Sequence, residues 1–403
     1  MKDIRNVIGI ILAGGKGERL SPLTAHRAKP GVPFGGKYRI IDFVMNSFIN
    51  SGIQNIKVLI QFKSQPLKQH IDRLYPSSPL YGHYIDTVSA QQKVGEEWYE
   101  GTADAVYQNL DILEAADFGA AAIFAGDHIF VMDVSQMYEF HCKKESEFTI
   151  AAIAVPVEQA AGQFGVIEVD RRNRVIGFEE KPEKPKEIPG RPGLCFASMG
   201  NYIADIPVLS GLLQEDAQNP DSKHDFGKNI IPMMLARSMP VYAYDFNSNL
   251  IEGQRRIYWR DVGTVRAYWE ANMDLCRIEP EINLYNRTWP IRTFPDNAPP
   301  AKFIFHPDLD NHIISGGCIV SGARVHGSVL GQWVRVEQGA NIVDSVIFPE
   351  VTVGAGVQLN TCIIDKKVNI PPGTRIGFSQ ADDEARGFSV VDGITVVPKG
   401  YQF

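Results

Sequence analysis

The sequence contains few cysteines and no long apolar run. Its 403 residues include five cysteines, which are scattered along the chain with no Cys-x-x-Cys pair. This pattern argues against a disulfide framework and a structural zinc site, and it favours a reducing compartment. No stretch approaches the roughly 20 apolar residues that span a bilayer, and residues 1–6 lack the apolar region of a signal peptide. We therefore expect a cytoplasmic protein without membrane contact.

The sequence also lacks the excess of positive charge that is typical of nucleic-acid-binding proteins. Its formal net charge is −7, which argues against nucleic-acid binding but allows a local basic pocket for a phosphorylated small molecule. The composition, 44% apolar and 22% charged, is that of a soluble globular protein. Because 403 residues exceed the size of one ordinary domain, we expect two domains.

Two familiar phosphate-binding motifs are absent from the glycine-rich segment at residues 13–20. Gly17 follows Lys16 where a P-loop has serine or threonine, and Leu20 stands where a dinucleotide fingerprint has glycine. The apolar run at residues 8–12 still predicts a buried strand, beyond whose carboxyl end a ligand can bind. A glycine turn with solvated charges fits the segment equally well. The candidate phosphate loop offers backbone N–H groups and positive charge from Gly14, Gly15, Lys16, Gly17, Arg19, Arg27 and Lys29.

Up to about residue 275, short apolar runs alternate with segments of helical period, which indicates an α/β domain. We predict strands at 55–60, 120–125 and 148–155, and helices at 102–115 and 135–144. A run rich in proline, glutamate and lysine at 179–193 should form a surface excursion. Prolines at 290, 295, 299 and 300 mark a linker. The predicted division is a first domain at 1–288, a linker at 289–312 and a second domain at 313–403.

Beyond the linker, apolar residues recur with a period of six. Three triplets have this spacing and begin 17 residues apart; they are Leu330, Val336, Ile342; Ile347, Val353, Leu359; and Ile364, Ile370, Ile376. Such repetition is typical of a triangular β-helix, in which each face contributes one inward aliphatic side chain. Ile319 and Val325 continue the phase, so we expect roughly three to four coils. So short a solenoid should pack on the first domain or on another subunit.

Two carboxylates follow predicted strands or precede turns. Asp127 ends the run 120–127, and Asp261 lies in YWRDVGT at 258–264. Each aspartate alone is more often a turn former or a helix cap. Together with substrate phosphates, however, two carboxylates suit Mg²⁺, which keeps much of its water.

Three further segments each allow a functional and an ordinary interpretation. Lys181 precedes Pro182 at the end of an extended run and could meet a phosphate, although such lysines are usually solvated. Segment 97–105 could receive a purine base, or it could begin a helix with Thr102 as its N-cap. The polar residues of HDFGK at 224–228 could hold sugar hydroxyls or simply close a loop.

These pieces together resemble one enzyme family over nearly the whole chain, the glucose-1-phosphate adenylyltransferases, or ADP-glucose pyrophosphorylases, of bacterial glycogen synthesis. The resemblance implies a Rossmann-like, GT-A-like nucleotidyltransferase domain followed by a left-handed parallel β-helix. It implies that ATP and α-D-glucose 1-phosphate yield ADP-glucose and pyrophosphate, with Mg²⁺ as cofactor, metabolite effectors and a homotetramer. The matching segments are LAGGKGERL (12–20), RAKP (27–30), FGGKYRIIDF (34–43), WYEGTADA (98–105), AGDH (125–128), FEEKP (178–182), ASMG (197–200), HDFGK (224–228) and YWRDVGT (258–264).

The resemblance also implies roles for individual residues. Asp127, Arg19 and Lys29 would be catalytic, and Asp127 and Asp261 would bind the metal. ATP would meet Gly14, Gly15, Lys16, Gly17, Arg19, Gln91, Tyr99 and Gly101. Glucose 1-phosphate would meet Tyr99, Gly165, Glu180, Lys181, Ser198, Asp225, Phe226 and Trp259, with Lys181 on its phosphate. In-line attack on the α-phosphorus needs positioning and charge neutralisation, so no covalent intermediate is expected.

An allosteric site is expected at His26, Arg27, Arg39 and Lys366. The sequence departs there from the well-studied enteric enzyme, because His26 stands in place of an activator-linked lysine and Lys366 in place of an arginine. Histidine is only partly charged at pH 7, and lysine lacks the bidentate geometry of arginine, so the activator's identity stays open.

Three other functions compete with this interpretation. A nucleotidyltransferase that uses GTP, UTP or dTTP would share the glycine loop and both aspartates. A non-catalytic regulatory subunit would keep the fold, although retention of Arg19, Asp127, Lys181 and Asp261 argues against it. A purely scaffolding solenoid would not need charged residues at strand ends.

Overall fold

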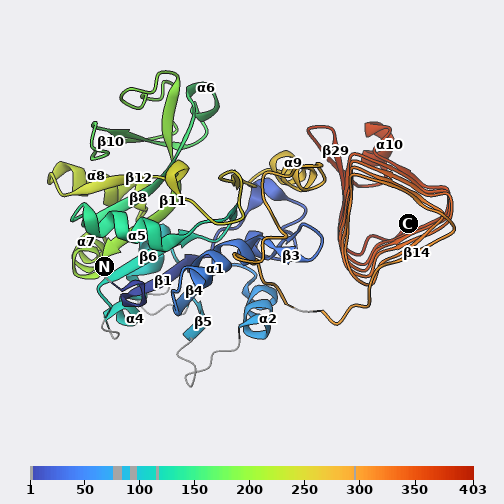
Figure 1. Ribbon diagram of the computed structural model, residues 1–403, viewed down its shortest axis with the longest axis horizontal. Helices are drawn as coiled ribbons and strands as arrows, with labels where there is room; N and C mark the ends of the chain where they lie inside the picture. The colour runs from blue at the N-terminus through green and yellow to red at the C-terminus, as the bar shows by residue number, and fades with distance from the viewer. Residues whose placement is uncertain (1–2, 76–83, 91–97, 115–117, 295) are drawn as a thin grey trace.

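Parallel strands form the centre of the amino-terminal domain (Figure 1). In this computed structural model, which describes residues 3–75, 84–90, 98–114, 118–294 and 296–403, β1 (Val7–Leu12) lies between β4 (Asn55–Ile60) and β6 (Ala120–Ala125). β5 (Tyr84–Ser89) pairs in parallel with β4. Antiparallel strands continue the sheet beyond β6, in the order β10-β9-β11-β6-β1-β4-β5, and β8 joins β11 to β12. Their bounds are β8 (Phe148–Pro156), β9 (Gly165–Val169), β10 (Val175–Glu180), β11 (Leu194–Asp205) and β12 (Val241–Asp245).

Helices cover both faces of this sheet, as the apolar run of β1 predicts. Val7 and Ile11 of β1 face one apolar cluster, whereas Ile8 and Ile10 face another. The first cluster includes side chains of α1 (Ile40–Asn50), α2 (Ser64–Leu74) and α5 (Val134–Lys143). The second includes side chains of α3 (Thr102–Tyr107), α4 (Leu110–Glu114), α7 (Ile206–Asp216) and α8 (Ile231–Ala236). The remaining helices are α6 (Val157–Ala160), α9 (Val265–Leu275) and α10 (Gln380–Ala385). None of the helices in the described ranges is long and apolar enough to cross a membrane.

The predicted elements of this domain are largely confirmed. The strands predicted at 55–60 and 120–125 match β4 and β6, and β8 is one residue longer than the predicted 148–155. The helix predicted at 102–115 is wrong as one element, because α3 ends at Tyr107 and α4 begins at Leu110; residue 115 lies outside the described part. The surface excursion predicted at 179–193 begins two residues late, because Glu179 and Glu180 belong to β10. Residues 181–193 lie outside helices and strands, as expected.

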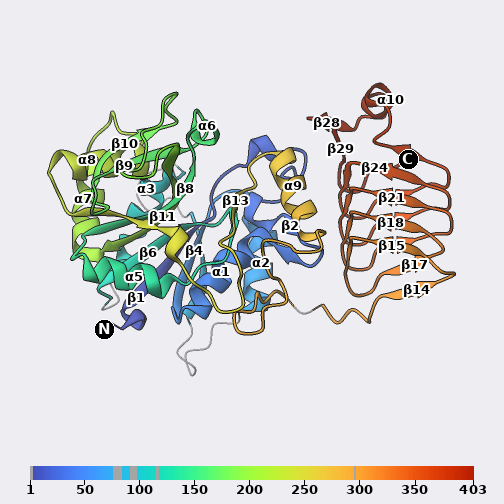
Figure 2. The same cartoon turned by 45° about the horizontal axis from the view of Figure 1, so that its top comes forward.

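The carboxyl-terminal domain is a left-handed parallel β-helix, whose stacked coils are seen in Figure 2. Its first face stacks β14 (Lys302–Ile304), β17 (Ile319–Ser321), β20 (Arg335–Val336), β23 (Thr352–Val353) and β26 (Asn369–Ile370). The second stacks β15 (Asp308–Asp310), β18 (Arg324–His326), β21 (Asn341–Val343), β24 (Gln358–Asn360) and β27 (Arg375–Ile376). The third stacks β16 (Ile313–Ile314), β19 (Val329–Leu330), β22 (Val346–Ile347), β25 (Cys362–Ile364) and β29 (Ile394–Val397), with β28 (Ser389–Val391) at its edge.

The nine predicted inward residues are all buried, with at most 2% of each exposed. The predicted start of the solenoid needs correction. Each face contains at least five strands rather than three or four, and β14 and β15 lie inside the segment expected to be a linker. Val320, not Ile319, lies beside Val336, so the phase shifts by one residue in the early coils. The prolines near residue 300 led to the prediction of a linker, so the first strands of the solenoid were not predicted.

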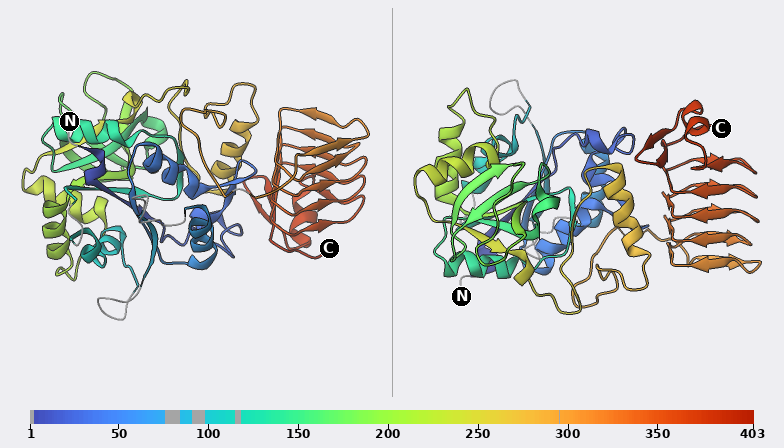
Figure 3. Two further views of the ribbon diagram at one scale, coloured as in Figure 1. Left: turned by 60° about the horizontal axis from the view of Figure 1, so that its bottom comes forward. Right: turned by 90° about the horizontal axis from the view of Figure 1, so that it is seen from above.

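The two domains share an apolar cluster, which packs α9 and the β2–β3 ribbon against the solenoid (Figure 3). Strands β2 (Pro33–Phe34) and β3 (Tyr38–Arg39) form this ribbon, and Phe34 and Tyr268 lie in one cluster with Phe348 of the solenoid. A buried ion pair crosses the same boundary. The Arg27 guanidinium donates two hydrogen bonds to the Asp365 carboxylate, at 3.0 and 2.9 Å. The predicted packing of the solenoid on the first domain is therefore confirmed.

The buried pair Arg27–Asp365 generates a test of this docking. Asp365→Leu leaves the guanidinium buried without its counter-charge, so we expect it to lower the free energy of unfolding by about 3–5 kcal/mol. The double variant Arg27→Met/Asp365→Leu should recover most of that loss, because neither member of the pair is then left as an unpaired buried charge. Urea unfolding followed by tryptophan fluorescence measures both. Equal stability of Asp365→Leu and the wild type would contradict the assignment.

Candidate active site

A cavity of about 1180 Å³ opens at the carboxyl ends of β1, β4 and β6. Leu12, Leu59 and Ala125 lie in one row across these strands, so the residues that follow them are neighbours. The cavity wall includes most of the expected site residues, namely Gly14, Gly15, Lys16, Gly17, Arg19, Lys29, Tyr99, Gly101, Asp127, Gly165, Glu180, Lys181, Ser198, Asp225 and Asp261. Gln91 lies outside the described residues.

The glycine loop follows β1 directly and forms one wall of the cavity. Its first turn is fixed by backbone bonds on both sides of Leu12, in which Ala13 N donates to Leu59 O and Gly126 N donates to Leu12 O. Gly17 has φ +63°, and a β-carbon there would lie 2.9 Å from the β-carbon of Lys29. Thr24 Oγ1 donates to Gly17 O at 3.0 Å and fixes the far end of the loop. The predicted glycine loop therefore has a defined conformation and lines the cavity.

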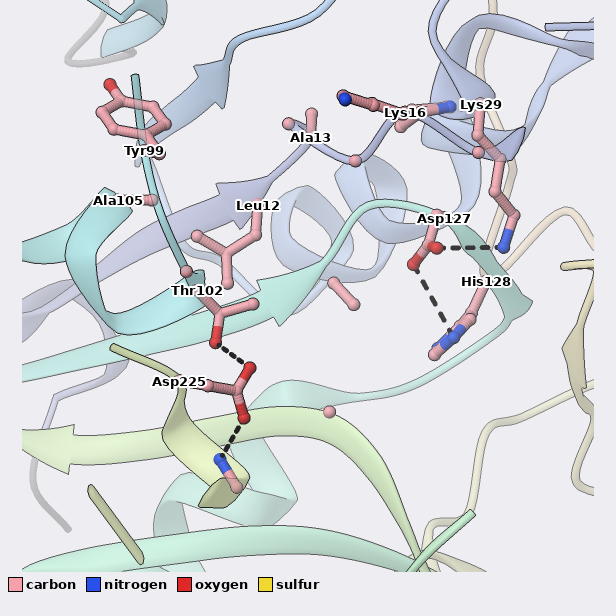
Figure 4. Close-up of a pocket in the computed structure, with 18 of the residues that line it drawn as sticks. Leu12, Ala13, Lys16, Lys29, Tyr99, Thr102, Ala105, Asp127, His128 and Asp225 are labelled. Atoms are coloured by element: carbon pink, nitrogen blue, oxygen red, sulfur yellow. Dashed lines mark hydrogen bonds and ion pairs between the residues drawn. The ribbon is translucent and has the colours of Figure 1, made fainter. Parts of the chain in front are cut away.

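Asp127 and Asp261 meet on one lysine, although 134 residues separate them in the chain. Lys29 Nζ lies 2.9 Å from Asp127 Oδ2 and 3.3 Å from Asp261 Oδ1. Asp127 follows β6, and Asp261 ends β13 (Trp259–Asp261), which pairs with β7 (His128–Phe130) so that Asp261 lies opposite His128. Figure 4 shows Lys29 and His128 on either side of Asp127. The ribbon β7–β13 thus brings the two carboxylates together.

The charges of this cluster stabilise one another. Burial opposes ionisation of Asp127, but the Lys29 ammonium and His128 outweigh it and lower the pKa of that carboxyl to about 2. Burial also opposes ionisation of Lys29 and would lower its pKa, but the charges of the two carboxylates raise that pKa above its usual value. Asp127 and Lys29 are therefore both charged at neutral pH.

The donor set at this cluster fits magnesium. Mg²⁺ prefers carboxylate oxygens and usually combines one or two of them with water and substrate phosphates. Asp127 and Asp261 supply two carboxylates beside the glycine loop, where phosphates would complete the coordination. Among the described residues, no group of three or more histidines, cysteines or acidic residues could hold a metal by itself.

The wall expected to meet adenine is built around Tyr99. Gln61 Nε2 donates to Tyr99 O at 3.3 Å, and Asn109 Nδ2 donates to the Tyr99 hydroxyl at 3.0 Å. Burial raises the pKa of Tyr99, so its hydroxyl stays protonated. The prediction that Thr102 is the N-cap of the next helix is wrong, because Gly101 holds that position and α3 begins at Thr102.

The opposite wall carries the residues expected to meet the sugar phosphate. Gly165 pairs with Glu180 across β9 and β10, and Lys181 follows with φ +51°. The two remaining candidates do not line the cavity. Phe226 is 1% exposed and packs on Phe148 and Tyr202, so it supports the wall from behind.

Trp259 also lies behind the cavity wall. Its ring is edge-on to His128 and Phe164, with centroids 5.4 and 5.5 Å away. Its buried Nε1 atom has no hydrogen-bond partner in the part of the chain that the structure describes.

Several residues of the cavity were not predicted from the sequence, among them His128, Gln61 and Lys63. His128 Nε2 lies 3.6 Å from Asp127 Oδ1 and 3.8 Å from Asp261 Oδ1, and Gln61 and Lys63 complete the wall near the glycine loop. Gln61 follows β4, and His128 comes directly after Asp127, so the rule that ligands bind beyond parallel strands could have identified both. Nothing in the sequence pattern distinguished Lys63.

Three of the four residues expected to bind an effector lie together, and the fourth, His26, is exposed. Arg27, Arg39 and Lys366 lie close enough at the domain boundary to affect one another's ionisation. Burial, followed by the charges of Arg39 and Arg27, lowers the pKa of Lys366 to about 8. Burial also lowers the pKa of Arg39. Asp365 neutralises Arg27, but the cluster keeps an excess of positive charge.

Comparisons with known proteins identify the family of the chain. Residues 8–278 match the nucleotidyl transferase family, and residues 299–397 match the GlmU-like C-terminal hexapeptide family. The chain is 50% identical over 410 residues to "Glucose-1-phosphate adenylyltransferase" of Thermus thermophilus, covering 98% of this chain and 99% of that protein. It is 47% identical over 410 residues to a relative with the same name in Deinococcus radiodurans, with the same coverage. A third relative of that name, in Aliivibrio fischeri, is 46% identical over 402 residues, with 98% of each chain covered. The chain therefore belongs to the glucose-1-phosphate adenylyltransferase family of nucleotidyltransferases.

Proposed function

We propose that this protein transfers the adenylyl group of ATP to α-D-glucose 1-phosphate, and so commits glucose to glycogen. The observation that carries the proposal is the meeting of Asp127 and Asp261 on Lys29 inside the cavity that the glycine loop and Lys181 also line. A phosphate oxygen of the sugar phosphate attacks the α-phosphorus of ATP. The bond from that phosphorus to the oxygen bridging the α- and β-phosphates breaks, and pyrophosphate leaves.

The chain's own residues bind and orient the two phosphorylated substrates. The glycine loop, with Lys16 and Arg19, would hold the triphosphate, and Lys181 would hold the sugar phosphate from the opposite wall. Asp127 and Asp261 would hold magnesium, which when bound neutralises phosphate charge. The Lys29 ammonium adds a fixed positive charge beside the same phosphates. Positioning and charge neutralisation suffice for in-line displacement, so no side chain needs to act as a nucleophile.

An assay of pyrophosphate release with each of four nucleoside triphosphates tests the reaction. Glucose 1-phosphate and Mg²⁺ are kept constant. ATP is expected to support the highest rate, because Tyr99 and Gly101, the residues expected to meet adenine, line the cavity. Higher activity with UTP would overturn the assignment of the nucleotide. No activity with any of the four would favour the non-catalytic subunit.

Removal of one metal-binding carboxylate should stop most turnover. We expect Asp127→Asn to lower kcat by at least about a hundredfold, because the two-carboxylate site is halved. Thermal unfolding should change little, since Lys29 keeps its contact with Asp261. The matched control is Asp392→Asn, at a turn of the solenoid with φ +50°, which asparagine tolerates. A normal rate at saturating Mg²⁺ would contradict the metal role of Asp127.

Loss of the Lys181 ammonium should weaken sugar-phosphate binding. For Lys181→Ala we expect the KM for glucose 1-phosphate to rise about tenfold or more, with a smaller change in the KM for ATP, because one phosphate contact is lost. Steady-state kinetics with each substrate varied in turn measures the difference. Lys184→Ala is the control, since this exposed lysine lies on the same loop and is not among the residues lining the cavity. An unchanged KM for glucose 1-phosphate would mean that Lys181 is a solvated surface lysine and does not bind the sugar phosphate.

We also propose that an anionic metabolite regulates the enzyme by binding Arg27, Arg39 and Lys366 at the domain boundary. The excess of buried positive charge there supports the proposal, because an anion would neutralise it. The site touches both the segment leading to Lys29 and the solenoid, so an occupant could bias the position of the catalytic lysine.

The lowered pKa of Lys366 gives the effector site a pH dependence. Above pH 8 the free enzyme has a neutral Lys366, so an anion must bind together with a proton and its affinity should fall as the pH rises. The charged groups that face Lys366 are Arg39 and Arg27, which lower its pKa, and Asp365 and Glu350, which raise it. The half-activating or half-inhibiting concentrations of fructose 1,6-bisphosphate, fructose 6-phosphate, pyruvate and AMP are measured from pH 7 to 9.

In Lys366→Arg the fall in effector affinity above pH 8 should disappear, because arginine stays charged. Lys367→Arg, at the exposed neighbouring position, should keep the wild-type profile. The same pH profile in Lys366→Arg and the wild type would exclude this lysine from the site.

A homotetramer in the cytoplasm completes the proposal. At one end of the solenoid, the first strand of each face has a free edge; these strands are β14, β15 and β16. The side chains of Phe303 and Phe305 are exposed at the same end. Unpaired edges and exposed aromatic side chains favour burial in an assembly.

A further inference from the structure

The base-side and sugar-side walls of the cavity are joined by a direct contact between two distant segments. One is the segment 99–102, which leads into α3, and the other is the loop 222–226. Together we call them the bracket. Figure 4 shows the link as the hydrogen bond between Thr102 and Asp225.

The loop caps the helix of the opposite wall. Gly101 is the N-cap of α3 and offers no side chain, so the first N–H groups need another acceptor. His224 O fills this role, since it accepts from Ala103 N at 2.8 Å and from Asp104 N at 3.2 Å. A β-carbon on Gly101 would lie only 2.1 Å from His224 O. Glycine at position 101 therefore permits the close approach of the two walls.

The Thr102 hydroxyl makes the second contact of the bracket. It donates to Asp225 Oδ2 at 2.9 Å and accepts from Phe226 N at 3.1 Å. The other carboxylate oxygen, Asp225 Oδ1, accepts from Gly227 N and Lys228 N. Both oxygens of Asp225 are thus fixed from the side of the protein, and the carboxylate keeps further lone pairs for a ligand in the cavity.

The loop is itself anchored to the end of α7. His224 Nδ1 lies 2.8 Å from Asp216 Oδ2, and Ser222 Oγ donates to Asp216 Oδ1 at 2.7 Å. The side chain of Asp216 is only 3% exposed. His224 is held with φ +47°, a conformation that this network supports. The sugar-side half of the bracket is therefore rigid, and Thr102 connects it to the base-side half.

We propose that Thr102 is a positioning residue that fixes the Asp225 carboxylate for sugar recognition and joins it to the base-side wall. The inference rests on the proposed function, in which Asp225 meets hydroxyl groups of glucose. A carboxylate held by charge-assisted hydrogen bonds loses little rotational entropy when a sugar binds. Without the hydroxyl of Thr102, Asp225 Oδ2 loses its donor and Phe226 N loses its acceptor.

Steady-state kinetics of Thr102 variants tests the inference. For Thr102→Val, which keeps the shape of the side chain, we expect the KM for glucose 1-phosphate to rise about tenfold, while kcat and the KM for ATP stay within about threefold. Thr102→Ser keeps the hydroxyl and should stay near the wild type. Thr102→Ala replaces the valine variant if that variant does not fold. Thr374→Val is the matched control, because its hydroxyl donates to Pro371 O on the distant solenoid.

A double-mutant cycle with Asp225→Asn separates positioning from direct contact with the substrate. If Thr102 acts through Asp225, the double variant should have a KM for glucose 1-phosphate no more than about twofold above that of Asp225→Asn alone. Fully multiplicative effects would mean that Thr102 contacts the substrate itself, and they would overturn the inference.

The cycle also distinguishes this inference from the proposed function. A wild-type protein that makes no ADP-glucose refutes the function. An active wild type with an unchanged KM in Thr102→Val refutes only the role of Thr102.

Discussion

The parallel register of β1 with β4 and β6 is the constraint on which the site depends. Leu12, Leu59 and Ala125 form one row, so the chain must leave all three strands at the same edge. The glycine loop, Gln61 and Asp127 are therefore neighbours, although more than a hundred residues separate the first from the last. Helices cover both faces of the sheet at this point, and the apolar side chains of β1 pack into one cluster on each face.

Lys29 converts this edge into an electrostatic site. A buried ammonium needs counter-charges, and Asp127 and Asp261 supply them from two different strands. The same cluster keeps Asp127 ionised, with its pKa lowered to about 2, so this carboxylate would be available to a divalent cation. The segment that carries Lys29 also carries Arg27, which is paired to the solenoid through Asp365. The ion pairs of Lys29 in the cavity and the interdomain ion pair of Arg27 are thus separated by only one residue along the chain.

Much of the fold and the site could be predicted because the decisive signals are local. Six-residue spacing identified the solenoid, and strand-end positions identified Asp127 and the glycine loop. The errors have physical causes. Prolines near residue 300 concealed β14 and β15, and the helix predicted at 102–115 breaks at Gln108 and Asn109, where Asn109 Nδ2 donates back to Ala105 O. Phe226 and Trp259 are aromatic residues near the site, but packing places them behind its wall.

Periodicity and short motifs depend on neighbouring residues, so they were sufficient to predict the two architectures, the place of the glycine loop and the family. The contacts between groups that are distant in the chain follow from the folded arrangement of the strands and domains. Asp261 reaches Asp127 through the pairing of β13 with β7, and Lys366 reaches Arg39 through docking of the solenoid. The hydroxyl of Thr102, which local pattern assigned to a helix cap, bonds instead to Asp225, 123 residues away. Hydrogen bonds and ion pairs of this kind depend on distances in space, which the order of residues along the chain does not specify.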